Sequence, residues 1–244
     1  MKYEVIDDHH SDVIINIRSY FSKSENSIWN QRNKIKVISF QEKKMTIKLF
    51  KIPHIINKII YTFFRDSKAK KSYRNSISII EFVPKPIGCA EFFKYGLLYD
   101  SYFISEQCHY DFTIREVLTR ETYADKENIL KQFAAFTYSL HEKGIEHLDY
   151  SPGNILIKKR DEEYMFKIID VNRMAFRELS LENRLKNFSK LWAANEDLAY
   201  IVEQYARIIS EDSKKCIKIA QKYSQNHKDR KNLKKWLKGQ KIVD

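Results

Sequence analysis

The sequence predicts an α+β fold in two lobes, with a small antiparallel β-sheet in the first lobe and mostly helices in the second. Two patterns predict it. Strand-like patterns occur over residues 24–50 and 86–106, and apolar residues three and four positions apart predict helices in the second half, after Asp125 and again after Arg173. The chain of 244 residues can bury a sizeable core. We expect one domain over residues 1–244, with an N-terminal lobe (about 1–105), a hinge (about 105–110) and a C-terminal lobe (about 111–244).

Within the first lobe, the pattern predicts three strands over residues 24–50, two helices over residues 53–80 and a hairpin over residues 86–106. The hairpin is expected to turn at Lys94-Tyr95-Gly96, where glycine tolerates the backbone of a tight turn. Val83-Pro84-Lys85-Pro86 is expected to form an extended connector, since each proline disfavours a helix before it.

The second lobe begins with a long helix. Asp125 is expected to cap it and Gly144 to end it. Its apolar face is predicted to consist of Ile129, Leu130, Phe133, Phe136 and Leu140. Near the C-terminus, helices are predicted over residues 181–194 and 196–209, and a basic segment, RKNLKKWLKG, follows them.

Between these helical regions, the stretch from His147 to Asp170 has the order of residues that phosphoryl transfer requires. His147, Asp149 and Asn154 fit the kinase catalytic-loop pattern H-x-D-x-x-x-x-N. Two apolar runs joined by a charged turn follow over residues 155–169 and predict a β-hairpin. Asn154 precedes its first strand and Asp170 follows its second, so both are expected at the same end of the hairpin.

These residue types suit the chemistry. Transfer of a γ-phosphoryl group needs a carboxylate that accepts the proton of the acceptor hydroxyl, and hard oxygen ligands for Mg²⁺. We expect Asp149 to be the base, Asn154 and Asp170 to hold Mg²⁺ against the phosphates of ATP, and His147 to orient the loop. Three polar residues near a hairpin can also match such a pattern by chance, but the hairpin and Asp170 make this less plausible.

Two further segments fit nucleotide binding. In the strand over residues 45–50, Lys48 faces the side opposite Ile47 and Leu49 and is expected to reach the α- and β-phosphates. A strand lysine is more often only a solvated residue. Its place about a hundred residues before the catalytic loop favours the nucleotide role. At the expected hinge, the backbone around Glu106 and Cys108 is predicted to bind adenine.

Three features depart from the general kinase pattern. No glycine precedes Gly88, so there is no glycine-rich loop, and the turn at Gln31-Arg32-Asn33 is expected to cover the nucleotide instead. The predicted helix over residues 67–80 has no glutamate to pair with the strand lysine, and Ser72 stands about where one is expected. Ser151 replaces the lysine that protein kinases usually carry two positions after the base. These absences keep a pseudokinase as an alternative.

Six segments together resemble one known family: TIKLFKIP, SKAKKSY, YFISEQ, HLDYSPGNIL, IIDVNRM and NFSKLW. They are similar to the Kdo/WaaP-type lipopolysaccharide kinases, bacterial enzymes of protein-kinase-like fold that phosphorylate sugars of the lipopolysaccharide inner core. The likeness spans about residues 28–195, and Asp170-Val171-Asn172 stands where protein kinases have D-F-G. The resemblance implies a two-lobed protein-kinase-like fold, ATP and Mg²⁺ as cofactors, and a lipid-linked sugar acceptor, a lipopolysaccharide precursor with Kdo or heptose.

Charge and cysteine content bound the partners and the compartment. The net charge is +12, from 44 basic and 32 acidic residues, which suits an anionic acceptor at the membrane. A lysine-rich composition that reflects an A/T-rich genome explains the charge equally well. Cys89, Cys108 and Cys216 are irregularly spaced and suggest reduced thiols in a cytoplasmic protein without zinc. No run of 18 apolar residues occurs, so we expect no membrane span.

One segment bears on the membrane. Over residues 53–64, the apolar pairs Ile55-Ile56, Ile59-Ile60 and Phe63-Phe64 recur every four residues and predict a helix with a wide apolar stripe. Basic residues surround the stripe: Lys51, Lys58, Arg65, Lys68, Lys70 and Lys71. The helix either packs this stripe onto the sheet of the first lobe or docks it at the inner leaflet of the cytoplasmic membrane. We favour packing, because the segment lies between two elements of the lobe.

Four functions compete. An active kinase of a lipopolysaccharide inner-core sugar leads, because it explains the catalytic-loop pattern and the family resemblance together. A protein kinase or another small-molecule kinase of the same fold comes next. A pseudokinase that binds a partner would explain the missing glycine-rich loop and glutamate. A nucleic-acid-binding module would explain the charge but leaves the catalytic-loop residues without a role, so we expect no nucleic acid partner.

Overall fold

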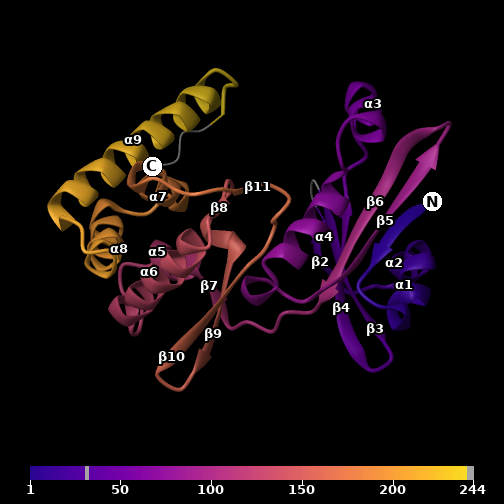
Figure 1. The fold of residues 1–244 in the computed structure, drawn as a ribbon, viewed down its shortest axis with the longest axis horizontal. Coiled ribbons are helices and arrows are strands. Elements are labelled where there is room, and N and C mark those ends of the chain that lie inside the picture. The colour runs from indigo at the N-terminus through magenta and orange to yellow at the C-terminus, as the bar shows by residue number, and fades with distance from the viewer. Residues whose placement is uncertain (31–32, 241–244) are drawn as a thin grey trace. The chain divides into compact units, whose positions relative to one another are not determined.

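A six-stranded antiparallel sheet forms the centre of the first of two units into which the chain divides (Figure 1). The computed structural model describes residues 1–30 and 33–240. The first unit contains Met1–His109 and Ile169–Arg173, and the second contains Tyr110–Ile168 and Met174–Asp244. The strand order of the sheet is β1-β5-β6-β4-β3-β2. These strands are β1 (Lys2–Val5), β2 (Ser27–Asn30), β3 (Lys34–Phe40), β4 (Lys43–Phe50), β5 (Pro86–Lys94) and β6 (Leu97–Glu106).

The three strands and the hairpin that the sequence predicts are confirmed, and tight turns explain their register. Tyr95 and Gly96 connect β5 to β6 with φ values of 53° and 76°. Gln41 and Glu42 connect β3 to β4 with φ values of 47° and 64°. Two consecutive left-handed residues match the twist of the flanking strands. The N-terminal strand β1, which the pattern did not reveal, pairs with β5 and places Lys2 opposite Glu91.

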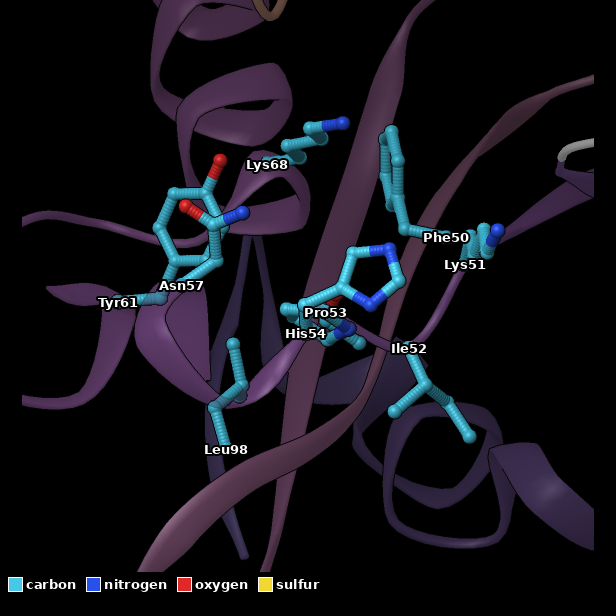
Figure 2. Close-up of a pocket in the computed structure, with 10 residues that line it drawn as sticks. Phe50, Lys51, Ile52, Pro53, His54, Asn57, Tyr61, Lys68 and Leu98 are labelled. Carbon is cyan, nitrogen blue, oxygen red and sulfur yellow. The ribbon is translucent and has the colours of Figure 1, made fainter. Parts of the chain in front are cut away.

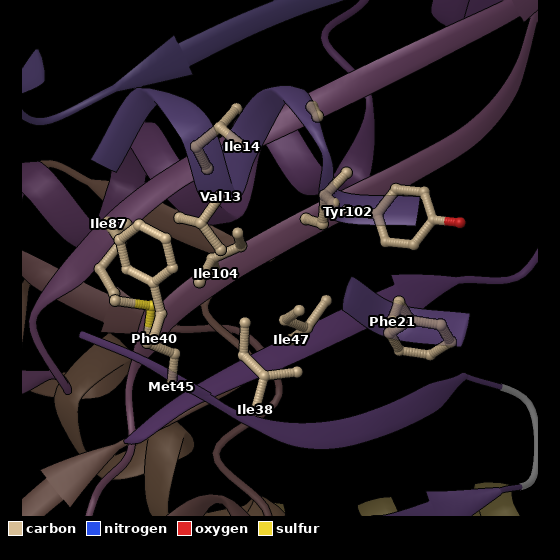
Figure 3. Close-up of a cluster of buried hydrophobic side chains, with 12 residues drawn as sticks. Val13, Ile14, Phe21, Ile38, Phe40, Met45, Ile47, Ile87, Tyr102 and Ile104 are labelled. Carbon is tan, nitrogen blue, oxygen red and sulfur yellow. The ribbon is translucent and has the colours of Figure 1, made fainter. Parts of the chain in front are cut away.

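Two short helices, α1 (Ser11–Ile15) and α2 (Ile17–Lys23), cover one face of this sheet (Figure 3). Val13, Ile14, Ile17 and Phe21 come from the helices and Ile38, Met45, Ile47 and Ile104 from the strands. Because successive side chains of a strand alternate between faces, burial of Met45 and Ile47 here directs Lys48 and Phe50 to the opposite face. Phe50 packs there against Ala69 of helix α4 (Lys68–Ser78). The predicted orientation of Lys48 is therefore confirmed.

Both helices predicted over residues 53–80 are present, as α3 (Ile55–Phe63) and α4. The expectation that α3 packs its apolar stripe onto the sheet is wrong. Ile56 is 70% exposed, Phe63 67% and Phe64 78%. The helix stands away from the sheet (Figure 1) and is attached by its opposite side, where Thr62 accepts a hydrogen bond of 2.9 Å from the backbone N–H of Leu98. The attachment uses polar contacts, so the apolar stripe stays uncovered by described residues of this unit.

The second unit is mostly helical, as predicted, with two small sheets ordered β10-β9-β7 and β11-β8. Its helices are α5 (Ile114–Thr119), α6 (Lys126–Glu142), α7 (Leu181–Asn187), the 3₁₀ helix η4 (Phe188–Leu191), α8 (Asn195–Ile208) and α9 (Ser213–Trp236). Its strands are β7 (Phe112–Thr113), β8 (Ile145–His147), β9 (Ile155–Arg160), β10 (Glu163–Ile168) and β11 (Met174–Phe176). The hairpin predicted over residues 155–169 is confirmed as β9 and β10.

Helix α6 is the central helix of this unit. Of its predicted apolar face, Ile129, Leu130, Phe133 and Leu140 are buried, while Phe136 is half-buried. Gly144 ends the segment with a φ of +66°, and a Cβ there would lie 2.7 Å from the carbonyl oxygen of Arg177. The predicted capping by Asp125 is wrong in its chemistry. Its carboxylate accepts hydrogen bonds from the side chains of Asn128 and Tyr164, because a φ of 57° turns it away from the helix backbone.

A membrane-spanning helix requires a long uninterrupted apolar segment. Among the residues that the structure describes, no helix is both long and apolar enough to cross a bilayer.

Candidate active site

Strand β4 carries Lys48, whose ammonium forms an ion pair of 2.8 Å with Oδ1 of Asp170. The same ammonium lies 5.1 Å from the ring centre of Phe50. Both charged residues belong to the first unit. Ser72, which stands where a kinase glutamate is expected, is buried in α4. Asp170 therefore provides a counter-charge for Lys48 that α4 does not.

The segment that carries Asp170 is held by short contacts. Asp170 has a φ of 60°, a left-handed conformation that aspartate adopts more readily than most residues. Asn172 donates a hydrogen bond of 2.5 Å to its Oδ1. From α4, the side chain of Asn75 donates one of 2.6 Å to the carbonyl of Val171. Sequence reasoning missed Asn75, and its only signal is the spacing of one helical turn from Ser72. Helix α4 thus positions the Asp170 segment through an amide.

The catalytic-loop residues lie in the second unit. His147 ends β8, opposite Met174 of β11, and is buried. Its Nδ1 accepts a hydrogen bond of 3.1 Å from the backbone N–H of Asp149, and Asn187 donates one of 3.0 Å to its carbonyl. These contacts tie His147 to the backbone of the loop and to Asn187. That His147 orients the loop stays a prediction.

Beyond Asp149 the chain turns back through the 3₁₀ helix η3 (Pro152–Asn154). Both the backbone N–H of Ser151 and the side-chain nitrogen of Asn154 donate hydrogen bonds to the Asp149 carbonyl, at 2.7 and 2.9 Å. Because the Asn154 amide nitrogen is used in this way, its oxygen Oδ1 is the atom that can bind a cation. The Asn154 side chain is therefore fixed against the backbone of Asp149.

Tyr150 anchors the catalytic loop in the core of the second unit. It is fully buried, its ring stacks on Phe133 at 5.8 Å, and its hydroxyl shares a hydrogen bond of 2.9 Å with Thr137. Burial raises the pKa of this hydroxyl, so it stays protonated. Gly153 allows close approach, because a Cβ there would meet the guanidinium of Arg115 at 2.5 Å. Nothing in the local sequence pattern revealed these supports, since they come from α5 and α6.

The β9–β10 register shows which two strand ends of the predicted hairpin lie together. Ile155 lies opposite Ile168, so the chain before β9 and the chain after β10 are at one end. Asn154 directly precedes Ile155, and Asp170 follows Ile168 by two residues. An amide oxygen and a carboxylate are the hard donors that Mg²⁺ accepts, together with water and nucleotide phosphates. Among the described residues there is no group of three or more His, Cys, Asp or Glu placed to bind a metal ion. The assignment of Asn154 and Asp170 as metal ligands stays a prediction.

At the expected hinge, β6 ends at Glu106. Its backbone N–H donates to the carbonyl of Lys85 at 2.8 Å, and that of Gln107 donates to Lys44 at 2.9 Å. The Glu106 N–H thus already has an acceptor, so adenine can engage Glu106 only through its carbonyl. Cys108 follows at a half-buried position. Of the turn expected to cover the nucleotide, Gln31 and Arg32 lie outside the described residues.

A pocket of about 200 Å³ lies at the foot of α3 in the first unit (Figure 2). Its walls combine the rings of Phe50 and Tyr61 with polar and basic groups from β4, α3, α4 and β6. They include Phe50, His54, Asn57, Tyr61, Lys68 and Ser101. Imidazole, amide, hydroxyl and ammonium groups of this kind bind phosphates and hydroxylated groups. The sequence did not predict this pocket, because its walls are distant along the chain.

Together, the antiparallel sheet followed by helices, the strand lysine paired with Asp170 and the loop over residues 147–154 define a protein of kinase-like fold. The model of the lipopolysaccharide kinase (Kdo/WaaP) family matches residues 61–211, more than half of the chain. The chain belongs to this family, and it is therefore a kinase.

A solved structure of WaaP in complex with acyl carrier protein supports the fold. It is similar to this chain with a TM-score of 0.60 and 12% sequence identity, over 93% of this chain and 99% of the WaaP chain. The comparison with curated proteins found no match. At this identity the solved structure bears on the fold alone, and the family assignment follows from the family model.

Proposed function

We propose that this protein transfers the γ-phosphoryl group of ATP, with Mg²⁺, to a hydroxyl of a Kdo or heptose sugar in the lipopolysaccharide inner core. The observation that carries the proposal is the catalytic loop, in which the backbone N–H of Asp149 donates a hydrogen bond to His147 and the backbone carbonyl of Asp149 accepts one from Asn154. In this proposal Asp149 is the general base, and His147 orients the loop.

The chain's own groups have defined tasks in this reaction. Asp149 accepts the proton of the sugar hydroxyl as its oxygen bonds to the γ-phosphorus, while the bond from this phosphorus to the β–γ bridging oxygen breaks and ADP leaves. Asn154 and Asp170 would hold Mg²⁺, and Lys48 would bind the α- and β-phosphates. ATP with its metal ion supplies the phosphoryl group and neutralises the charge that develops on it. We expect the Lys48–Asp170 pair of 2.8 Å to open when the nucleotide binds, because Lys48 then pairs with the phosphates and Asp170 with Mg²⁺.

An active enzyme is favoured over a pseudokinase by this same pair. The absence of a glutamate in α4 would leave the lysine without a counter-charge, but Asp170 supplies one, and Asn75 secures its segment. The test is mass spectrometry of lipopolysaccharide from cells with and without the gene. One phosphate should disappear when the gene is deleted, and return with the wild-type gene but not with Asp149→Asn. An unchanged phosphate content would refute the proposed acceptor.

We also propose that α3 docks the protein peripherally at the inner face of the cytoplasmic membrane, where a lipid-linked acceptor is held. Its exposed Ile56, Phe63 and Phe64 form an apolar surface, and Lys51 and Arg65 flank it at exposed positions. The pocket at the foot of the helix suits a phosphate-bearing headgroup. Acidic lipids attract such basic groups, and salt screens the attraction over ~8 Å.

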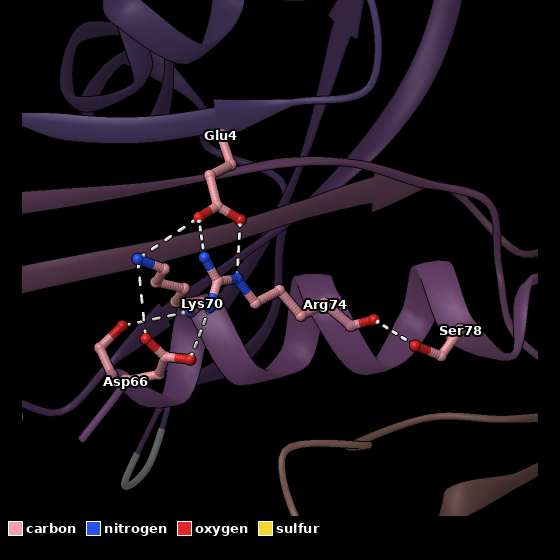
Figure 4. A network of polar contacts seen from close by, with 6 residues as sticks. Glu4, Asp66, Lys70, Arg74 and Ser78 are labelled. Atoms are coloured by element: carbon pink, nitrogen blue, oxygen red, sulfur yellow. Dashed lines mark hydrogen bonds and ion pairs between the residues drawn. The ribbon is translucent and has the colours of Figure 1, made fainter.

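Not every basic residue expected to face the membrane is available to it. Lys70 pairs with Glu4 at 3.3 Å and with Asp66 at 3.6 Å (Figure 4), so its charge is neutralised within the protein. Lys58 lies over the ring of Tyr99 at 5.3 Å. Attraction of the α3 region to acidic lipid therefore depends less on the basic residues of α4 than the sequence suggested.

Vesicle flotation tests the membrane proposal. Because the stripe is exposed, Ile56→Ser with Phe63→Ser should leave folding intact while it abolishes flotation with vesicles that contain acidic lipid. Ile77→Ser, at an exposed apolar residue of α4, is the matched control and should float like wild type. Flotation that persists in the double variant contradicts docking through α3.

The WaaP comparison supports a second partner, an acyl carrier protein, since that structure contains one. We propose that this chain also binds one. Size-exclusion chromatography of the chain with purified acyl carrier protein tests this, and separate elution contradicts it.

A further inference from the structure

Basic side chains gather in the second unit around the junction of η4 and α9. We name Lys186, Lys190, His227, Arg230 and Lys231 the α9 basic cluster. Lys190 of η4 lies at its centre, with its ammonium 3.4 Å from Nδ1 of His227. Burial first, and then Lys190 and Lys231, lower the pKa of His227 to about 4. The imidazole is therefore neutral at pH 7 and accepts the hydrogen bond, so the lysines and the arginine carry the charge of the cluster.

The positive charges of this cluster act on one another and on the catalytic loop. Burial lowers the pKa of Lys190, and repulsion from Lys231 and Lys186 lowers it further, while attraction to Asp149 and Glu146 opposes them. His227 also feels the charge of Asp149. The cluster is thus close enough to the catalytic loop to interact electrostatically with the proposed base.

The cluster lacks the carboxylate partners that lysines usually have. In the described part of the chain, Lys186, Lys190 and Lys231 form no salt bridge with a carboxylate. Glu146, the other acidic group that attracts Lys190, already pairs with Arg177 at 2.7 Å. Lys190 is half-buried, whereas Lys186, Arg230 and Lys231 are exposed. Like charges gathered around a half-buried lysine lower stability, so such an arrangement is expected where an external anion completes it.

Neighbouring contacts hold the cluster in place. The ring of Trp192 meets His227 edge-on at 6.0 Å, and the ammonium of Lys235 lies over the same indole at 5.9 Å from its ring centre. Lys228 donates a hydrogen bond of 2.9 Å to the carbonyl of Ala193. His227 and Lys231 are four residues apart and share one face of α9. These contacts fix His227 and the start of this region of α9 against η4, and His227 in turn holds the ammonium of Lys190 at the centre of the cluster.

We propose that the α9 basic cluster is an anion-binding subsite for the acceptor, which receives its carboxylate or phosphate and so places the neighbouring hydroxyl against Asp149. This inference rests on the proposed function, since it names the part of the acceptor that the enzyme recognises. The cluster is specific for an acidic acceptor because a neutral sugar leaves the lysines without a counter-charge. The α9 basic cluster lies on elements that are distant in sequence from the catalytic loop. Within that loop, Ser151 replaces the lysine of protein kinases.

Steady-state kinetics with matched acceptors test the subsite. Lys190→Gln and Lys231→Gln are compared with wild type on a soluble sugar acid and its methyl ester, and on a phosphorylated sugar and its dephosphorylated form. The first pair reports a carboxylate and the second a phosphate. Lys190→Gln should raise KM at least tenfold for the acidic member of one pair, and leave the neutral member and the KM for ATP near wild type. Lys190→Arg should restore most of the loss, since it restores the charge.

Lys222→Gln is the matched control, because Lys222 is an exposed lysine on the opposite face of α9 and its loss changes the net charge equally. It should behave like wild type. Equal losses on acidic and neutral acceptors would overturn the proposal, because the lysines would then serve phosphoryl transfer itself. An unchanged KM for both acidic acceptors would overturn it too.

A binding measurement separates this proposal from the proposed function. Inorganic phosphate and the sugar acid are titrated into wild type and Lys190→Gln, and the NMR shifts of labelled protein are followed. Binding that depends on Lys190 supports the subsite even if no phosphorylation is detected, which would count against the proposed function alone. Equal binding by both proteins overturns the subsite.

Discussion

Basic side chains gather at two places in this protein, and the two gatherings are built in opposite ways. On α4, two cations meet the same two carboxylates (Figure 4): Arg74 pairs with Glu4 at 2.7 Å and with Asp66 at 3.0 Å, and Lys70 contacts the same two acids. In the α9 basic cluster, the cations meet one another and a neutral histidine. The first arrangement is complete within the protein, and the second requires an anion from outside.

The difference teaches how to interpret a net charge of +12. Count and composition cannot distinguish the lysines that stabilise the fold from those that bind a ligand, because both are the same residue type. The distinction lies in whether a carboxylate neutralises the charge in the folded chain. Lys48 is an intermediate case, since its partner Asp170 is itself a proposed ligand of Mg²⁺.

The largest expected effect concerns Asp149, the carboxylate to which the α9 basic cluster is attracted. Asp149→Asn should lower kcat at least a hundredfold, about 3 kcal/mol or more, because it removes the proton acceptor. ATP binding should change little, because the substitution leaves Asn154 and Asp170 in place. Stopped or coupled assays of phosphoryl transfer measure the loss. Asp229→Asn, at an exposed position of α9, is the control with full activity expected. Retention of more than a tenth of wild-type turnover would show that Asp149 is not the base.

A fall in pH should destabilise the second unit before it destabilises the first. Burial holds the pKa of His141 at about 4, and His227 has a pKa of about 4 as well. Below pH 6.5 the unfolded chain binds more protons than the folded chain, so the free energy of unfolding falls as the pH falls from 6.5 to 4. For the buried His141 this amounts to roughly 3 kcal/mol.

The first unit should respond later to acid. Burial raises the pKa of Glu4, but Arg74 and Lys70 together lower it further and leave it below its usual value of 4.5. That contribution is present above pH 4.5 and is lost below it. Hydrogen exchange should be measured at pH 7, 6 and 5. As the pH falls, the backbone amides of α8 should begin to exchange faster at a higher pH than the backbone amides of β5. The reverse order would contradict the assignment, and His141→Gln should flatten the dependence in α8.

Lys48→Met tests whether Lys48 binds the nucleotide or only pairs with Asp170. The substitution keeps the length of the side chain and removes its charge, so ATP affinity or turnover should fall at least tenfold, about 1.4 kcal/mol. Titration with ATP and Mg²⁺ measures it, with Lys44→Met at an exposed position of β4 as the control. If the affinity and the turnover both match wild type, the ion pair with Asp170 is only a structural contact.

The smallest effects should have opposite signs at the two basic regions. Arg74→Gln should lower the free energy of unfolding by up to about 1 kcal/mol, because two exposed ion pairs are lost. Lys231→Gln should leave it unchanged or raise it by a few tenths of a kcal/mol, since it relieves repulsion of Lys190. Chemical denaturation at low and high salt measures both. A destabilising Lys231→Gln would mean that this charge is neutralised within the protein.

Periodicity and residue spacing by themselves determined much of the fold. Alternation predicted β3, β4 and the β5–β6 hairpin, because a half-buried strand must place apolar side chains on one face. Spacing of three and four predicted α6 and α8 for the corresponding reason in helices. The order of His147, Asp149 and Asn154 predicted the candidate catalytic loop, since a short loop places side chains by sequence distance alone.

Tertiary structure decided what depends on contacts between distant segments. It left the stripe of α3 exposed, because a helix shows which face is apolar but not what covers it. The carboxylate that pairs with Lys48 is Asp170, more than a hundred residues away, and the amide that secures its segment is Asn75. Lys190 meets His227 only because α9 folds back onto η4. Burial and charge partners depend on which surfaces meet in three dimensions, and a local pattern carries no information about them.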